Sequence, residues 1–80
     1  MEKWKVVGWR YVDFEDGNGK HVSGYSLFLA RPGQSADVTG LEVQKLFISK
    51  QYVAYDPVEN QMIGISFNRY GKVQSIEVLG

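Results

Sequence analysis

The sequence predicts a small all-β domain, a five-stranded barrel that is either OB-like or SH3-like, with at most one short helical turn. Five segments are rich in β-branched and aromatic residues, turn-forming Gly, Asn, Asp and Pro separate them, and no window keeps a 3.6-residue period. Eighty residues leave room for one core, so residues 1–80 form a single domain. Five strands in so short a chain close into a barrel more easily than they build two stacked sheets, and closure removes exposed edges.

The first expected strand covers residues 4–14, with β-branched and aromatic residues on both sides of a central Gly8. A glycine inside a strand often marks a bulge or a sharp bend. We therefore expect Gly8 to bend this long strand so that it serves both sides of the barrel. The sequence Asp16-Gly17-Asn18-Gly19 follows and, because these residues tolerate positive φ angles, it predicts a hairpin turn.

The second and third expected strands cover residues 21–30 and 42–52. Arg31-Pro32-Gly33 ends the second strand, because proline cannot continue a hydrogen-bonded ladder. The polar loop that runs from there to about Gly40 has the length of a mobile or functional segment.

Apolar residues are more numerous in these two strands than one barrel interior needs. Leu27, Phe28 and Leu29 are consecutive in the second strand, and the third carries apolar residues on both parities, including Phe47 and Ile48. An uncovered apolar patch usually has a partner. We therefore expect a homodimer.

The fourth and fifth expected strands cover residues 62–70 and 72–79. Residues 56–60 break the pattern and allow at most one helical turn before Ile63, Ile65 and Phe67 alternate with smaller residues, which is the period of a half-buried strand. The segment from Asn68 to Gly71 has the residues of a type I turn between the two strands.

Composition limits the classes of function. Nine basic and nine acidic residues cancel, so the overall charge gives no support for polyanion binding, although a basic face can exist within a neutral total. The absence of cysteine excludes disulfides and thiolate metal sites. The first residues run directly into a strand pattern, without an apolar run of signal-peptide or membrane-spanning length, so the expected location is the cytoplasm.

Catalytic residues are poorly represented, and we expect no enzyme, no cofactor and no metal. His21 is the only histidine, it lies beside a glycine-rich turn, and no nucleophile is paired with it in the sequence. The segment from Gly17 to Lys20 lacks the spacing and the following helix of a phosphate-binding loop. The acidic residues near glycine and proline are ordinary turn formers, and no EF-hand pattern is present.

Aromatic residues interleaved with cations on the strands are the remaining signal. Proteins that bind single strands stack bases on aromatic rings, at about 1–3 kcal/mol per base, and contact phosphates with cations. Tyr25 and Tyr70 are the principal stacking candidates, with Tyr52 and Tyr55 as further ones. The candidate phosphate contacts are Lys20, Arg31, Lys45, Lys50, Arg69 and Lys72. The alternative is that the tyrosines are core or rim residues and that the lysines keep strand edges from pairing.

The stretch from His21 to Leu27 resembles the second-strand region of the single-stranded DNA-binding proteins of filamentous phages, in which Tyr-Ser-Leu follows a hairpin with Gly and Lys. The whole chain also resembles small uncharacterised proteins of phages and mobile elements of Gram-positive bacteria, through Gly24 to Leu27, Phe47 to Lys50 and Asn68 to Val73. The first resemblance implies an OB fold, a homodimer and a DNA-contacting Tyr25. The neutral charge and the long loop after Arg31 depart from that family.

Two hypotheses follow from these observations. The first is a non-enzymatic single-stranded DNA-binding protein of a phage or mobile element, which requires Tyr25, Tyr70 and at least three of the candidate cations on one concave surface. The second is a protein-interaction or structural β-barrel that binds no nucleic acid and acts on a host protein partner. It requires an exposed apolar patch near Phe28 or Phe47.

Overall fold

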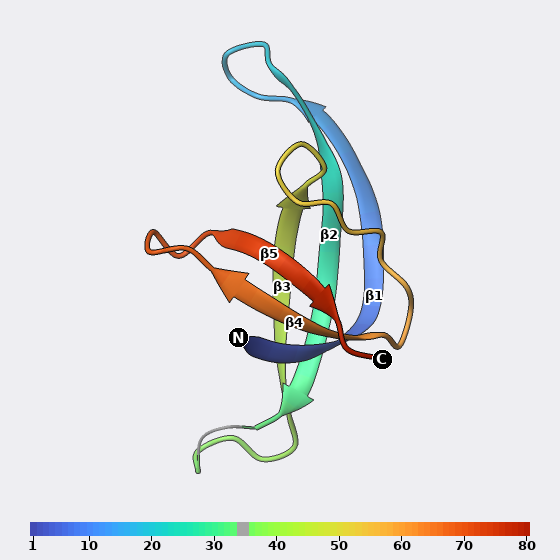
Figure 1. The fold of residues 1–80 in the computed structure, drawn as a ribbon, viewed down its shortest axis with the longest axis vertical. Helices are drawn as coiled ribbons and strands as arrows, with labels where there is room; N and C mark the ends of the chain where they lie inside the picture. Colours follow the sequence, from blue (N-terminus) through green and yellow to red (C-terminus); the bar gives the residue numbers. More distant parts are fainter. Residues whose placement is uncertain (34–35) are drawn as a thin grey trace.

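The computed structural model describes residues 1–33 and 36–80 and confirms the all-β class (Figure 1). Five strands form one antiparallel sheet, and the described residues contain no helix. The strands are β1 (Glu2–Glu15), β2 (His21–Pro32), β3 (Leu41–Ser49), β4 (Met62–Phe67) and β5 (Val73–Val78).

Most strand boundaries agree with the sequence pattern, and two predicted ends were too late. The strand expected over residues 42–52 ends at Ser49, because the amides of Tyr52 and Val53 donate to the Ser49 carbonyl in a tight turn. The strand expected over residues 62–70 ends at Phe67, because Asn68 begins the hairpin turn. The predicted loop after Arg31 lies partly outside the described residues, and β2 itself continues to Pro32.

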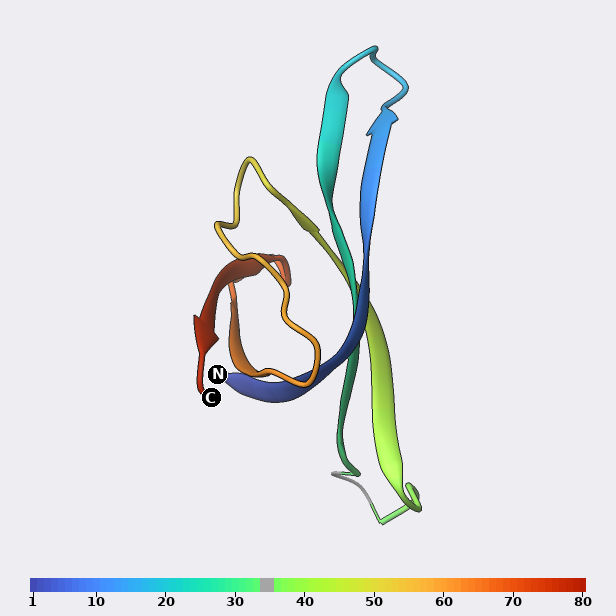
Figure 2. The same cartoon turned by 90° about the vertical axis from the view of Figure 1, so that its right-hand side faces the viewer.

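The strand order is β3-β2-β1-β4-β5, so β4 pairs with β1 and not with β3, its predecessor along the chain. This leaves β3 and β5 as the two edges of the described sheet, and the expected closed barrel was wrong in this respect. The segment 50–61 lies between β3 and β4 on the inner side of the sheet (Figure 2). The Val53 and Tyr55 side chains of this segment pack into the core. Packed side chains, and not a further pair of hydrogen-bonded strands, therefore complete the barrel-like arrangement.

A bulge in β1 confirms the role predicted for Gly8. Val6 pairs with Leu29 and Gly8 pairs with Phe28, so Val7 is the extra residue. An extra residue shifts the alternation of side chains by one position. Val6 before the bulge and Trp9 after it therefore lie on the same face of the sheet, which is also the face of their partners Leu29 and Leu27.

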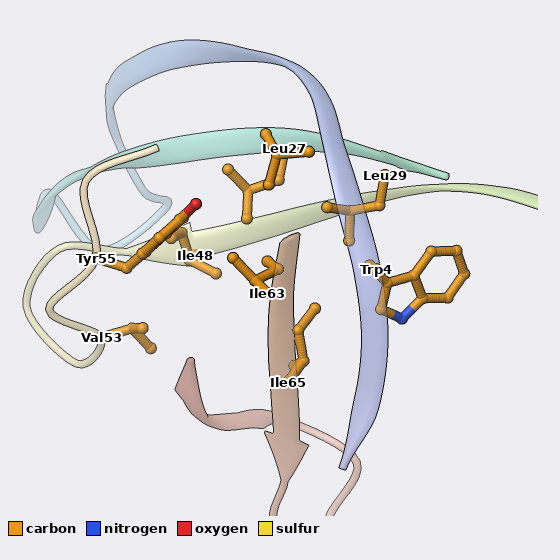
Figure 3. Close-up of a cluster of buried hydrophobic side chains, with 9 residues drawn as sticks. Trp4, Leu27, Leu29, Ile48, Val53, Tyr55, Ile63 and Ile65 are labelled. Atoms are coloured by element: carbon orange, nitrogen blue, oxygen red, sulfur yellow. The ribbon is translucent and has the colours of Figure 1, made fainter. Parts of the chain in front are cut away.

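We define two faces from this register. The inner face carries the core, which consists of Trp4, Val6, Leu27, Leu29, Ile48, Val53, Tyr55, Ile63 and Ile65 (Figure 3). The outer face is the opposite side of β1, β2 and β3, and Figure 2 shows β4, β5 and the segment 50–61 all gathered on the other side. Strands covered on one side only leave their second face for solvent or a partner.

Side chains of Asp and Asn fix the two hairpin turns. The Asp16 carboxylate accepts from the amides of Asn18 and Lys20, both at 2.9 Å. The Asn68 side-chain carbonyl accepts from the amides of Tyr70 and Lys72, at 2.8 and 3.1 Å. Both turns were predicted from these residue types.

Tyr55 anchors the segment 50–61 to the core. Its ring is buried, and its hydroxyl donates to the Gln61 side-chain carbonyl at 2.6 Å. Burial raises the pKa of the Tyr55 hydroxyl, and a hydrogen bond with the backbone of Val58 acts in the opposite direction. The phenol therefore stays neutral and keeps its donor role. This residue is structural, which agrees with the alternative interpretation of the tyrosines.

The molecule is elongated, at 44 × 25 × 19 Å. Its radius of gyration is 13.6 Å, against about 12 Å for a compact domain of this length. The hairpin formed by the end of β1 and the start of β2 accounts for part of this length, since it projects beyond the core in both views (Figures 1 and 2).

Candidate nucleic-acid interface

Three aromatic rings and one lysine meet on the inner face of the projecting β1–β2 hairpin. The ring centroids of Trp9 and Tyr25 are 5.5 Å apart, and those of Tyr11 and Tyr25 are 5.8 Å apart, both in edge-to-face geometry. The Nζ atom of Lys50 lies 5.8 Å from the Tyr11 centroid and 5.8 Å from the Tyr25 centroid. We call this group of four residues the hairpin cluster.

The local structure explains how the cluster forms. Tyr11 and Tyr25 are direct cross-strand partners, and Trp9 lies one pair further along the same face, opposite Leu27. Cross-strand neighbours on one face have Cβ atoms close enough for aromatic contact. The amide of Lys50 donates to the Ser23 carbonyl at 3.0 Å, which carries the β2–β3 pairing one residue beyond β3 and places Lys50 beside the rings.

The exposure of the rings makes them available for stacking. Trp9 is 44% exposed and Tyr11 is 48% exposed, whereas Tyr25 is half-buried and packs against the core. Tyr25 therefore fixes the position of two more accessible rings. Proteins bind single-stranded nucleic acids by stacking bases on aromatic faces and by contacting phosphates with cations such as an ammonium group.

An acidic group borders the cluster on the same face. Asp13 follows Tyr11 in the alternation, and its carboxylate contacts Nε2 of His21 on β2. The pair contains no serine or lysine nucleophile, and the described residues hold no group of three or more potential metal ligands. The exposed rings and the ammonium group of the cluster suit the binding of a ligand at this hairpin.

Of the predicted site residues, only Tyr25 and Lys50 belong to the hairpin cluster. Lys20 lies in the turn at the hairpin tip, where its backbone amide binds Asp16. Lys45 lies on the outer face, opposite Phe28.

Arg31 has structural partners at the other end of β2. Its guanidinium carbon lies 4.0 Å from the Trp4 ring centroid, and the group pairs with Glu2 at 3.3 Å and Glu42 at 3.1 Å. Two carboxylates already neutralise this cation, so it is poorly placed to attract a phosphate.

Tyr70, Arg69 and Lys72 form a separate group in the turn between β4 and β5. The Arg69 guanidinium stacks on the Tyr70 ring at 5.0 Å and donates to its hydroxyl at 2.9 Å, and Tyr70 is 72% exposed. This turn lies at the left of Figure 1, apart from the tip of the β1–β2 hairpin. Within the described part of the chain, Tyr25 makes its ring and cation contacts with Trp9, Tyr11 and Lys50. The predicted residues therefore occupy several places and do not form the single surface that was expected.

Trp9 and Tyr11 were missed as site residues, although the sequence held a usable signal. A hairpin turn at Asp16–Gly19 pairs Glu15 with His21, and counting back along both strands pairs Tyr11 with Tyr25. Trp9 is two residues before Tyr11, so strand alternation places it on the same face. Residues 4–14 were predicted only as a long bent strand, and their register against the second strand was not used to look for site residues.

The outer face carries the exposed apolar patch that the protein-interaction hypothesis requires. Phe28 is 38% exposed and Phe47 is 40% exposed, and the Phe14 ring lies 6.2 Å from the Phe47 ring. Patches of this kind are typical of protein-interaction sites.

Comparison with known proteins gives no relative: no family model, curated protein or solved structure matches the chain. The described residues also form no helix of the length and apolar character needed to cross a bilayer. Functional inference therefore depends on the geometry of the hairpin cluster and of the outer face.

Proposed function

We propose that this chain is a non-enzymatic protein that binds single-stranded nucleic acid, with single-stranded DNA of a phage or mobile element as the expected ligand. The hairpin cluster is the observation that supports this proposal. Trp9, Tyr11 and Tyr25 offer stacking surfaces on a projecting hairpin, and Lys50 supplies a cation beside two of them. The Tyr-Ser-Leu resemblance to filamentous-phage proteins begins at Tyr25, which lies within the same cluster.

Residue types favour nucleic acid over protein at this site. The cluster consists of one indole, two phenols and one ammonium group, and Ser23 is the next residue on its face of β2. The polar atoms of such a surface are hydrated and its rings are flat. A surface of this kind binds nucleic-acid bases better than it binds the aliphatic side chains of a protein partner. The surface required by the sequence hypothesis, with Tyr70 and three candidate cations beside Tyr25, is not formed, because Tyr70 lies in the β4–β5 turn with Arg69. The proposal therefore depends on the hairpin cluster alone.

Titration of a labelled thymidine oligonucleotide tests the proposal. Tyr11→Ala is expected to weaken binding roughly tenfold, because stacking contributes about 1–3 kcal/mol per base. Tyr11 is suited to this test because it is half-exposed and its loss leaves the core intact. Lys50→Gln should weaken binding by less, because one exposed cation contributes less than a stacked ring.

Tyr70→Ala is the matched control, since it removes an exposed tyrosine from another part of the molecule. We expect less than a twofold change in affinity. The proposal is wrong if the protein binds no oligonucleotide at low salt, or if Tyr70→Ala weakens binding while Tyr11→Ala does not.

A protein-interaction barrel is the second candidate, and the exposed Phe28 and Phe47 favour it. It differs from the first in requiring no affinity for oligonucleotides. Both activities can coexist, because the hairpin cluster and the phenylalanines lie on opposite faces of the sheet.

A further inference from the structure

Charged residues are segregated between the two faces of β1, β2 and β3. On the outer face of these strands, all of whose residues the structure describes, the charged side chains are Lys3, Lys5, Arg10 and Lys45. On the inner face of the same strands lie all four of their acidic residues, Glu2, Asp13, Glu15 and Glu42. A chain with no net charge thus presents one uniformly basic face.

The bulge in β1 creates this segregation. Before it, odd-numbered residues such as Lys3 and Lys5 face outward, and after it even-numbered residues such as Arg10 do so. If residues 2–15 alternated without a bulge, Arg10 would lie on the face opposite to Lys3 and Lys5, and Asp13 would join the lysines.

Cations and apolar side chains alternate across this face. Three rows of residues run perpendicular to the strands, each from β1 through β2 to β3. They are Arg10, Ser26 and Phe47; Gly8, Phe28 and Lys45; and Lys5, Ala30 and Val43. Each row contains one cation, and the cations lie on β1 and β3 alternately around the Phe28 ring. All four cations are exposed, and Val43 is 74% exposed.

The face also has a recess that can receive a side chain. A groove at its lower end is lined by Met1, Lys3, Lys5, Val7, Leu41 and Met62, among others. Glu2 also lines this groove, but its carboxylate already accepts from Arg31 and from the Trp4 indole. These apolar side chains, bordered by the exposed Lys3 and Lys5, fit an apolar group that has carboxylates next to it.

We propose that the outer face binds an acidic segment of another protein in which carboxylate and large apolar side chains alternate. Carboxylates would pair with Lys5, Arg10 and Lys45, and an apolar side chain would enter the groove. Charge complementarity of this kind selects partners and speeds association. The inference does not depend on nucleic-acid binding by the hairpin cluster.

The same observations disfavour other occupants of this face. A second copy related by a two-fold axis would bring the same cations together, which is repulsive. A nucleic acid would find the rings of Phe28 and Phe47 on this face, but the side chains around the groove, Val43, Leu41 and Val7, are aliphatic and offer no ring for stacking. The groove is a local recess, which suits a protein side chain better than the flat surface of a bilayer.

The test is fluorescence anisotropy with a labelled synthetic peptide that alternates Asp and Glu with Leu and Phe. The comparison peptide replaces the acids by Asn and Gln. We expect the full-length protein to bind the acidic peptide, at least roughly tenfold more tightly than the amide peptide, with an affinity that falls as salt is raised. No binding up to millimolar acidic peptide, or equal binding of both peptides, overturns the proposal.

Charge reversal locates the interaction. The triple variant Lys5→Glu, Arg10→Glu, Lys45→Glu should lose roughly tenfold or more in peptide affinity, because it removes three charge pairs. The control Lys20→Glu, Arg69→Glu, Lys72→Glu makes the same change in net charge in the two hairpin turns and should change affinity less than twofold. Equal losses in the two variants would mean that overall charge, and not the outer face, attracts the peptide.

Two further measurements separate this proposal from the alternatives and from misfolding. Val43→Ser alters an exposed side chain and should weaken the peptide complex without changing the thermal midpoint. Oligonucleotide affinity should be unchanged in the outer-face triple variant. If that variant loses oligonucleotide binding and Val43→Ser leaves peptide binding intact, the face is a nucleic-acid surface and the protein-partner inference is wrong.

Discussion

Individual residues in this protein have roles that their types alone do not reveal. Arg31 was predicted from the sequence to contact phosphate, but its guanidinium stacks on the Trp4 ring and pairs with two carboxylates. Tyr55 is a candidate stacking residue that instead fills the core. Gly24 precedes Tyr25 of the hairpin cluster and is required by the close approach of the β3 backbone, since a Cβ atom there would lie 2.0 Å from the Ile48 carbonyl oxygen.

Replacing Gly24 tests this packing constraint. Gly24→Ala should destabilise the protein by about 1–3 kcal/mol, because the obstacle is backbone of β3 that cannot rotate away. Denaturant unfolding measures the effect. The control is Gly17→Ala, which meets no atom within 4 Å in the β1–β2 turn and should change stability by less than about 0.5 kcal/mol. Equal stabilities of the two variants would contradict this account of Gly24.

At the scale of elements, the bulge in β1 organises both faces of the sheet. Trp4 and Val6, before the bulge, point into the core. Trp9 and Tyr11, which follow the bulge on β1, contact Tyr25 of β2. The bulge also gathers Arg10 with Lys3 and Lys5 on the outer face. One extra residue thus sets the positions of both proposed binding surfaces.

Inserting one alanine between Gly8 and Trp9 should disrupt this arrangement. The added residue shifts the alternation by one position, so either the core side chains or the hairpin rings must move to the opposite face, and we expect a loss of at least about 2 kcal/mol in stability. Nuclear Overhauser contacts between the Trp9 and Tyr25 rings should disappear. Val7→Ala keeps the residue count and, since Val7 is half-exposed, should have little effect. An insertion variant that retains wild-type stability and ring contacts would contradict this account of the register.

At the scale of the whole molecule, neutrality and elongation shape the proposed activities. The hairpin cluster has one cation at its rings, so nucleic-acid affinity should come mainly from stacking. The homodimer expected from the sequence stays a prediction. The basic outer face is a poor place for a symmetric interface, so the free edges β3 and β5 are the better candidates for one.

Salt dependence tests the stacking-dominated mode of binding. Single strands give a slope of about −0.7 in log affinity against log salt for each phosphate contacted. With Lys50 and at most one or two further cations engaged, we expect a slope of about −1 to −2 for a thymidine oligonucleotide. Isothermal titrations at several salt concentrations measure it. A slope steeper than about −4 would mean that a broad cationic surface, such as the outer face, carries the binding.

The sequence by itself determined the all-β class, the number of strands, both Asx-type hairpin turns and the bulge near Gly8, because these depend on local alternation and on residues suited to particular φ angles. It also indicated surplus apolar residues near Phe28 and Phe47. Only the tertiary structure decided that β4 pairs with β1, that the sheet stays open and that Trp9 and Tyr11 join Tyr25. Those outcomes depend on pairing between residues far apart in the chain and on a register in which a shift of one position exchanges the two faces.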